Sequence, residues 1–82
     1  MEYQLQPRAI KRILGEELDF RRNAFYHAYP NFIMSDTMKE MVESSYRKQK
    51  ELLKECETYE ELESFIEFAG YRMSLEDWVS SL

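Results

Sequence analysis

The sequence predicts an all-α fold, a small single-domain bundle of four to five helices formed by residues 1–82. Three stretches repeat apolar residues at the spacing of one helix face, and residues that commonly begin or cap a helix precede each stretch. The chain has only two glycines and two prolines, too few for a fold made of short strands and tight turns. With 82 residues, 44% of them hydrophobic, it can bury one modest core.

The first predicted helix covers residues 7–28 and follows an irregular arm at residues 1–6. Pro7 suits the first turn of a helix, because the N–H that it lacks would have no partner there. Ile10 and Leu14 then begin an apolar stripe at helical spacing. The stripe predicts that this face of the helix packs against the rest of the domain.

Two charged residues interrupt this first apolar stripe. If the helix is continuous, Glu17 and Arg21 lie on the same face as the apolar residues before them. Either the two charges pair at i,i+4 on a partly covered face, or the helix bends or breaks near Gly15 and turns a new face inward. We favour the bend or break at Gly15.

The second predicted helix covers residues 36–56. Pro30 ends the first helix, since the residue before a proline avoids the helical conformation. Ser35 and Thr37 are capping residues at the start of the second helix. One apolar face follows, made of Met38, Met41, Val42, Leu52, Leu53 and Cys56.

The third predicted helix, residues 59–69, has the clearest start in the sequence. Thr58 and Glu61 form a capping box, in which each side chain accepts a hydrogen bond from the backbone N–H of the other residue. Gly70 is the expected left-handed stop, followed by Tyr71 in a Schellman arrangement. The core stripe of this helix is Leu62, Phe65, Ile66 and Ala69.

A last short helix is predicted at residues 75–81, because Ser74 and Asp77 have the spacing of a helix cap. The apolar stripes together predict one core. Its members are Ile10, Leu14, Phe25, Met41, Val42, Leu52, Leu53, Leu62, Phe65, Ile66, Leu75 and Trp78. Cys56 shares the face of Leu53, so we expect a buried thiol that reacts slowly.

The residue types that catalysis requires are scarce. His27 is the only histidine and Cys56 the only cysteine, so no catalytic triad, zinc site or internal disulfide is expected. Adjacent acidic residues such as Glu60 and Glu61 point to different sides of a helix, which does not suit an acid–base pair. There is no glycine-rich phosphate loop. We expect no enzymatic activity, no cofactor, no metal and no catalytic residue.

Charge is distributed unevenly along a chain whose net charge is −5. Residues 1–50 hold nine Lys or Arg and seven Asp or Glu, a net +2, whereas residues 51–82 hold two against nine, a net −7. The acidic third would repel nucleic acid and attract a basic protein groove. The alternative is that the two parts attract each other within the fold.

The third helix carries the most suggestive surface. With its apolar stripe facing inward, Glu60, Glu63 and Glu67 point outward in one row, and Phe68 lies on the flank. Such a row predicts a protein-binding face for a partner with a basic groove, in which charge speeds the encounter and Phe68 supplies apolar contact. The alternative is an ordinary solvated helix face, with Phe68 packed onto the aromatic residues of the fold itself.

Twelve aromatic residues are many for so small a core, so some of them lie near the surface. Tyr26, Tyr29 and Phe32 are the candidates for a secondary protein contact. They also suit a homodimer in which aromatic side chains bury against a second copy.

A basic side of the first helix suggests a second class of function. Arg8, Lys11 and Arg12 lie on one side of that helix and could follow a phosphate backbone. The sequence pI near 4.9 weighs against direct nucleic-acid binding. Nucleic-acid binding is therefore the less favoured hypothesis.

The start of the chain, Met1-Glu2-Tyr3-Gln4-Leu5-Gln6, lacks the basic and apolar regions of a signal peptide. No run of about 18 apolar residues is present for a membrane span. We therefore expect a cytoplasmic protein that does not associate with a membrane.

Residues 46–78 resemble the Nif11-type helical leader domain. The matching features are Tyr-Arg-Lys-Gln-Lys-Glu-Leu-Leu at 46–53, Thr-Tyr-Glu-Glu-Leu at 58–62, Ala-Gly-Tyr at 69–71 and Ser-Leu-Glu at 74–76. The resemblance implies an all-helical segment, which in that family is a leader recognised by peptide-modifying enzymes. We use it as an indication of fold rather than of function.

Taken together, the sequence predicts a small acidic, non-enzymatic protein-binding module. A phage or mobile-element inhibitor of a host nucleic-acid-handling complex, of the anti-CRISPR or polymerase-inhibitor type, fits this description. The alternatives are a nucleic-acid-associated regulator that uses the basic first helix, and a structural homodimer.

Overall fold

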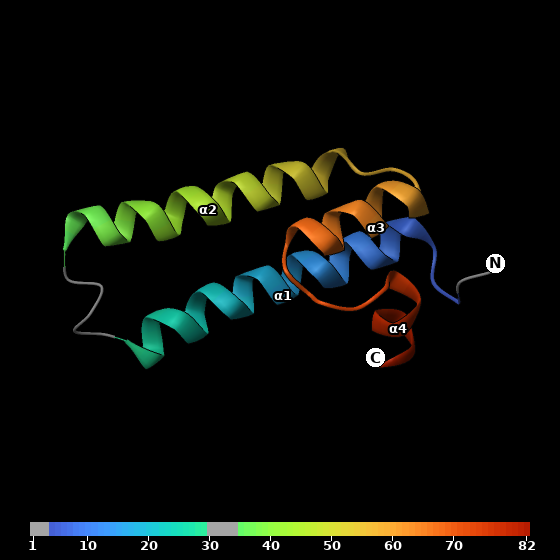
Figure 1. Ribbon diagram of the computed structural model, residues 1–82, viewed down its shortest axis with the longest axis horizontal. Coiled ribbons are helices and arrows are strands. Elements are labelled where there is room, and N and C mark those ends of the chain that lie inside the picture. The colour runs from blue at the N-terminus through green and yellow to red at the C-terminus, as the bar shows by residue number, and fades with distance from the viewer. Residues whose placement is uncertain (1–3, 30–34) are drawn as a thin grey trace.

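A computed structural model describes residues 4–29 and 35–82, and Figure 1 shows their arrangement. Within these residues there are four helices and no strand: α1 (Pro7–Ala28), α2 (Asp36–Glu55), α3 (Tyr59–Phe68) and α4 (Leu75–Ser80). The predicted all-α class is confirmed. The predicted ends of the helices are also confirmed, to within about one residue.

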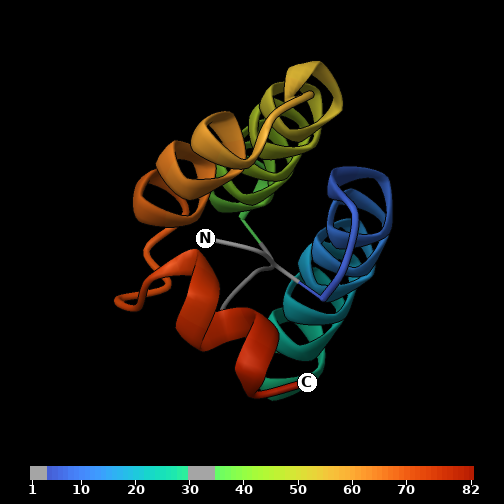
Figure 2. The same ribbon diagram turned by 90° about the vertical axis from the view of Figure 1, so that its right-hand side faces the viewer.

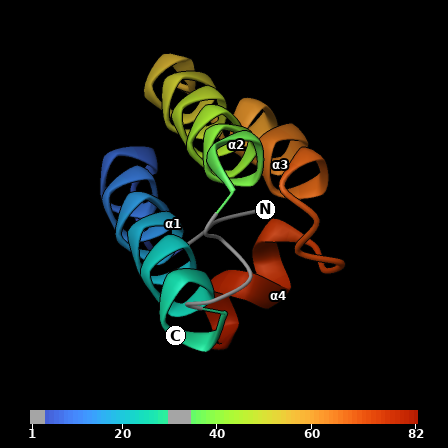
Figure 3. The ribbon, with the colours of Figure 1, turned by 90° about the vertical axis from the view of Figure 1, so that its left-hand side faces the viewer.

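The long helices α1 and α2 form an antiparallel hairpin, and α3 and α4 cover only part of it (Figure 1). Viewed from either end, α3 lies beside α2 and α4 lies beside α1 (Figures 2 and 3). The hairpin of α1 and α2 therefore forms one layer, and α3 and α4 form the other. The molecule measures 45 × 23 × 19 Å. The end of α1 and the start of α2 extend beyond α3 and α4 (Figure 1). Arg21 still contacts Ala69 and Tyr71, and Lys48 contacts Phe68, so we call residues 22–28 and 36–47 the projecting half of the hairpin.

Side-chain caps fix the starts of three helices. Ser35, Thr58 and Ser74 each accept a hydrogen bond from the backbone N–H three residues later, at 3.1–3.2 Å. At α3 the predicted capping box is complete, because the Glu61 carboxylate accepts the Thr58 N–H in return. The capping residues in the sequence therefore marked these starts correctly.

The end of α3 also follows the prediction. Gly70 has a φ of 77°, the left-handed conformation that glycine adopts without steric strain. Its N–H donates to the carbonyl of Glu67, and the N–H of Tyr71 donates to the carbonyl of Ile66. These two bonds define a Schellman motif, which turns the chain back towards α1.

The predicted break in the first helix is wrong, because α1 runs from Pro7–Ala28 without interruption. The two charged residues of its apolar stripe, Glu17 and Arg21, both contact the C-terminal segment. The Glu17 carboxylate accepts a 2.8 Å hydrogen bond from the indole Nε1 of Trp78. The Arg21 guanidinium lies 4.1 Å from the centroid of the Tyr71 ring and donates to the carbonyl of Ala69 at 3.2 Å. Both polar residues lie in the apolar stripe because partners from the C-terminal segment meet them there.

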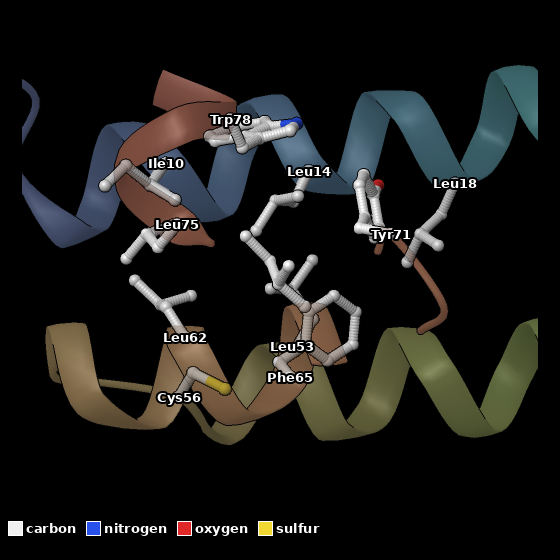
Figure 4. Close-up of a cluster of buried hydrophobic side chains, with 11 residues drawn as sticks. Ile10, Leu14, Leu18, Leu53, Cys56, Leu62, Phe65, Tyr71, Leu75 and Trp78 are labelled. Atoms are coloured by element: carbon white, nitrogen blue, oxygen red, sulfur yellow. The ribbon is translucent and has the colours of Figure 1, made fainter. Parts of the chain in front are cut away.

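One core lies where α3 and α4 cover the hairpin (Figure 4). Its buried members are Ile10, Leu14, Leu18, Leu53, Cys56, Leu62, Phe65, Ile66, Tyr71, Leu75 and Trp78. Eight of the twelve predicted core residues are confirmed, and so is the burial of Cys56. Leu18 and Tyr71 are core residues that the prediction missed.

Four predicted core residues are not buried. Met41 and Leu52 are exposed, and Phe25 and Val42 are only half-buried. Leu52 lies beside α3 but about 100° around the helix from the buried Leu53. For the other three the reason is helix length: α1 and α2 extend for about 30 Å, whereas α3 extends for about 15 Å and α4 for about 9 Å. The apolar stripes of the hairpin therefore continue past the helices that cover them.

Where the projecting half joins the covered part of the hairpin, a polar network links α1 to α2. The Arg22 guanidinium donates to both oxygens of Glu43, at 2.7 and 2.8 Å, and lies 4.7 Å from the centroid of the Tyr46 ring. The Tyr46 hydroxyl donates to Asp19, which also pairs with Lys50 at 3.2 Å. We refer to these five residues as the interhelix network.

Gly15→Ala should stabilise the protein. Gly15 lies inside an unbroken helix, where a glycine destabilises by roughly 0.5–1 kcal/mol relative to alanine. An added Cβ would lie 3.6 Å from Lys50 Nζ and 3.8 Å from Leu53 Cδ2, which are ordinary contact distances. We expect a higher melting temperature by calorimetry; a lower one would mean that the hairpin needs the bare backbone at this position.

Phe65→Ala should cost about 3–5 kcal/mol of unfolding free energy, because Phe65 is only 4% exposed. Phe68→Ala is the matched control on the same helix. The Phe68 side chain is 54% exposed, so its loss should change stability by only about 0.5 kcal/mol. Urea unfolding of both variants measures the difference, and equal losses would show that the wrong face of α3 has been assigned to the core.

Acid should weaken the interhelix network. The hydrogen bond from Arg22 holds the pKa of Glu43 below its ordinary value of 4.5, and that from Tyr46 lowers the pKa of Asp19. A lowered pKa in the folded state means that the stabilisation is present above about pH 4.5 and is lost as the pH falls below it. Melting temperatures from pH 7 to pH 3 should therefore fall less for Glu43→Gln than for the parent. Parallel profiles would show that the pair contributes nothing to stability.

Candidate protein-docking site

The predicted acidic row on α3 is only partly free. Glu60 and Glu67 are exposed, as expected. Glu63 is half-buried, and its carboxylate accepts the backbone N–H of Leu75 at 2.8 Å, in the first turn of α4. Glu63 therefore helps to hold α4 on α3. Replacing it would disturb the fold as well as any docking surface.

Phe68 lies on a different side of α3 from Glu63. Its ring is 5.9 Å from the Lys48 ammonium of α2, and its side chain is 54% exposed. Glu63 and Glu67 instead line a hollow with Arg72 and Met73, on the side of the loop that leads to α4. Phe68 therefore lines a different hollow from Glu63 and Glu67, with which it was predicted to act.

The exposed Phe68 forms one wall of a groove between α2 and α3. The groove has a volume of about 390 Å³, and its other wall includes Leu52, which is 38% exposed. Cys56 and Phe65 are the buried residues that line it. Two carboxylates, Glu55 and Glu61, and the hydroxyl of Ser64 complete the lining.

The Glu61 carboxylate is held in its charged form. It accepts the backbone N–H of Glu57 at 3.0 Å and that of Thr58 at 3.1 Å, and these bonds lower its pKa. The capping box that starts α3 therefore also fixes a negative charge at the groove. A partner that docks here meets an apolar surface beside fixed and exposed carboxylates.

Sequence reasoning missed the roles of Leu52 and Glu55 in this groove. Leu52 was assigned to the core together with Leu53, although adjacent residues on a helix lie about 100° apart and cannot share one face centre. That angle was a usable signal. No comparable signal showed that α3 would lie beside the C-terminal end of α2.

The structure describes two of the three aromatic residues proposed as a secondary contact. Tyr26 is half-buried, and burial raises its pKa. Tyr29 is exposed, and its ring centroid lies 5.2 Å from that of Phe25. Phe32 lies outside the described residues.

The basic residues of α1 meet further charges from α2. Lys11 and Arg12 line a hollow of about 490 Å³ together with Lys50 and Lys54. Lys11 donates to the carbonyl of Lys54 at 2.8 Å. Three acidic residues line the same hollow, namely Glu16, Asp19 and Glu51. Arg8, the third basic residue predicted there, is exposed but does not line this hollow.

Cys56 is buried beside the groove floor, as predicted. Its thiol lies 3.3 Å from the carbonyl of Leu52, and burial raises its pKa. A raised pKa leaves less thiolate at neutral pH. The slow reaction of this thiol stays a prediction.

Among residues 4–29 and 35–82, no three His, Cys, Asp or Glu side chains are placed to hold a metal ion. Over the same residues, none of the helices has the length and apolar character needed to cross a bilayer.

No protein-family model, curated protein or solved structure matches this chain. The resemblance of residues 46–78 to the Nif11-type segment stays a prediction.

Proposed function

We propose that this protein is a small acidic, non-enzymatic binding module that docks a basic segment of a partner protein in the groove between α2 and α3. The observation that carries the proposal is the pair of exposed apolar side chains, Leu52 and Phe68, that two different helices place on the walls of one groove. Glu55 and Glu61 line the same groove. A segment with an apolar anchor between Lys or Arg residues matches this surface.

The magnitudes favour shared roles for apolar contact and charge. Burying a whole Phe side chain is worth roughly 1.5–3 kcal/mol, and about half of Phe68 is still exposed, so its docking can add about 1 kcal/mol. That contribution alone does not give a stable complex. The net charge of −7 on residues 51–82 would raise the association rate with a basic partner, and Phe68 would slow dissociation.

Within this class, we propose an inhibitor that acts in the cytoplasm on a nucleic-acid-handling complex. A protein groove that binds phosphates is basic, and an acidic helix surface can occupy it. A phage or mobile-element protein of the anti-CRISPR or polymerase-inhibitor kind would work in this way. Glu60 and Glu67, which are exposed, would extend the acidic surface beyond the groove.

Direct nucleic-acid binding has less support. Four cations line the hollow between α1 and α2, but three carboxylates line it as well. Lys50 is paired with Asp19 at 3.2 Å, and Lys11 is bonded to a backbone carbonyl. A phosphate backbone would have to compete with these interactions.

Phe68→Ala and Glu55→Lys should both weaken binding of the partner. Immobilised parent protein would be used to retain proteins from a lysate of the source organism. We expect the parent and Phe20→Ala to retain the same partner protein, and Phe68→Ala to lose it. Phe20 is the control because it is a phenylalanine outside the groove that is more exposed than Phe68, 73% against 54%.

Purified partner then separates the two contributions. Glu55→Lys should slow association at low salt, and the difference from the parent should shrink as ionic strength rises. Phe68→Ala should speed dissociation. If both variants bind the partner with parental rates while remaining folded, this groove is not the docking site.

A further inference from the structure

The groove between α2 and α3 carries opposite charges at its two ends. The two helices run in opposite directions, so the end of α2 lies beside the start of α3 (Figure 1). There the Cys56 thiol lies 3.6 Å from the carbonyl of Glu61, and Glu55 and Glu61 line the groove. Further along, the Lys48 ammonium lies 5.9 Å from the centroid of the Phe68 ring. We call these positions the acidic end and the basic end of the groove.

The charges at both ends are available to a partner. Glu55 and Lys48 are exposed, and neither takes part in the ion pairs found within residues 4–29 and 35–82. The bonds that the Glu61 carboxylate accepts from the capping box all go to Oε1. Its Oε2 can therefore still accept a bond from a cation of the partner.

Neighbouring charges line other parts of the surface. Glu51 lines the hollow between α1 and α2, and Glu67 lines the hollow beside the loop that leads to α4. Lys11 on α1 acts on Glu61, but its ammonium is already bonded to the carbonyl of Lys54. The opposite charges of the acidic end and the basic end are therefore not cancelled by a residue that lines the groove.

The two ends are separated by two helical turns. On α2, Glu55 follows Lys48 by seven residues, and on α3, Phe68 follows Glu61 by the same number. Seven helical residues extend for about 10 Å. Between the ends, Leu52 on one wall leaves an apolar stretch exposed. The groove thus presents a carboxylate pair, an apolar stretch and an ammonium in that order.

A helix suits this groove better than an extended segment does. Helices α2 and α3 bond their backbone groups along their own axes, so neither offers a strand edge to the partner. A buried extended segment would leave its own N–H and C=O groups unpaired. A helix pairs these groups internally and presents only side chains to the groove.

We propose that the segment docked in this groove is an amphipathic helix with a basic residue at the acidic end, apolar anchors in the middle and an acidic residue at the basic end. The two charged positions would be seven residues apart. This inference rests on the proposed function and narrows its partner. A second basic residue beyond the anchor would meet Lys48, a like charge that disfavours it.

Three synthetic helical peptides test the proposal. They share two leucines at the third and fourth positions after the first charged residue, and they carry Lys then Glu, Lys then Lys, or Glu then Glu at positions seven apart. Anisotropy of the labelled peptides measures their binding to the full chain at low salt. The parent should bind the Lys–Glu peptide about fivefold more tightly than the Lys–Lys peptide, because an exposed attraction replaces a repulsion. This preference should shrink as ionic strength rises.

Lys48→Glu should reverse the preference, so that the Lys–Lys peptide binds more tightly than the Lys–Glu peptide. Both proteins are measured against the same peptides, so differences in peptide helicity cancel. Arg47→Glu is the matched control, because it makes the same change of charge at an exposed residue about 100° further around α2. It should keep the parental preference. Lys48 is exposed, so the melting temperature of Lys48→Glu should match that of the parent.

A parent that binds the three peptides equally, or that prefers the Lys–Lys peptide, overturns the proposal, and so does Lys48→Glu with the parental preference. Phe68→Ala that binds the Lys–Glu peptide as tightly as the parent also overturns it, because the peptide would then lie outside the groove. If no peptide binds at concentrations up to about 1 mM, the helical segment is wrong. Retention of a lysate protein by the parent and its loss by Phe68→Ala would still support the proposed function in each of these cases, so the two failures are distinguishable.

Discussion

A mismatch of helix lengths governs this structure. The hairpin helices have 22 and 20 residues, whereas the two helices that pack on them have 10 and 6. A core forms only where both layers are present. Apolar residues of one helix stripe are therefore buried in the covered part and more exposed beyond it. On α2, Leu53 is buried, while Val42, which lies on the same face eleven residues earlier, is only half-buried. The groove between α2 and α3 lies within the covered region, beside Leu52 and Phe68.

The second layer is held on α1 by polar contacts as well as by the core. Glu17 accepts the Trp78 indole N–H, and the Arg21 guanidinium stacks on the Tyr71 ring. Glu17 is half-buried within an otherwise apolar stripe, where a carboxylate without a hydrogen-bond donor would be unfavourable, whereas Arg21 is exposed. The contacts therefore specify which residues of the C-terminal segment lie over α1. Glu63 has a related role from α3, since it accepts the first backbone N–H of α4.

Two grooves of the molecule differ in the charges that line them. The groove between α2 and α3 combines Leu52 and Phe68 with carboxylates, which favours a basic segment from another protein. The groove on the projecting half is lined by Phe25, Met41 and Val42 together with Arg21 and Arg22, and no described carboxylate lines it. The two grooves have no lining residue in common.

The sequence by itself determined the helix starts, the stop at Gly70 and most of the core. Those features depend on neighbours within about four residues, such as Ser74 capping its own helix. The placement of Glu17 and Phe68 was decided only by the tertiary structure. The apolar stripe of a helix shows that one face prefers burial, but it does not show how far the covering helix reaches. In this protein α3 and α4 are short, so they cover only part of the two long helices. The apolar stripes are buried in that part and continue, more exposed, beyond it.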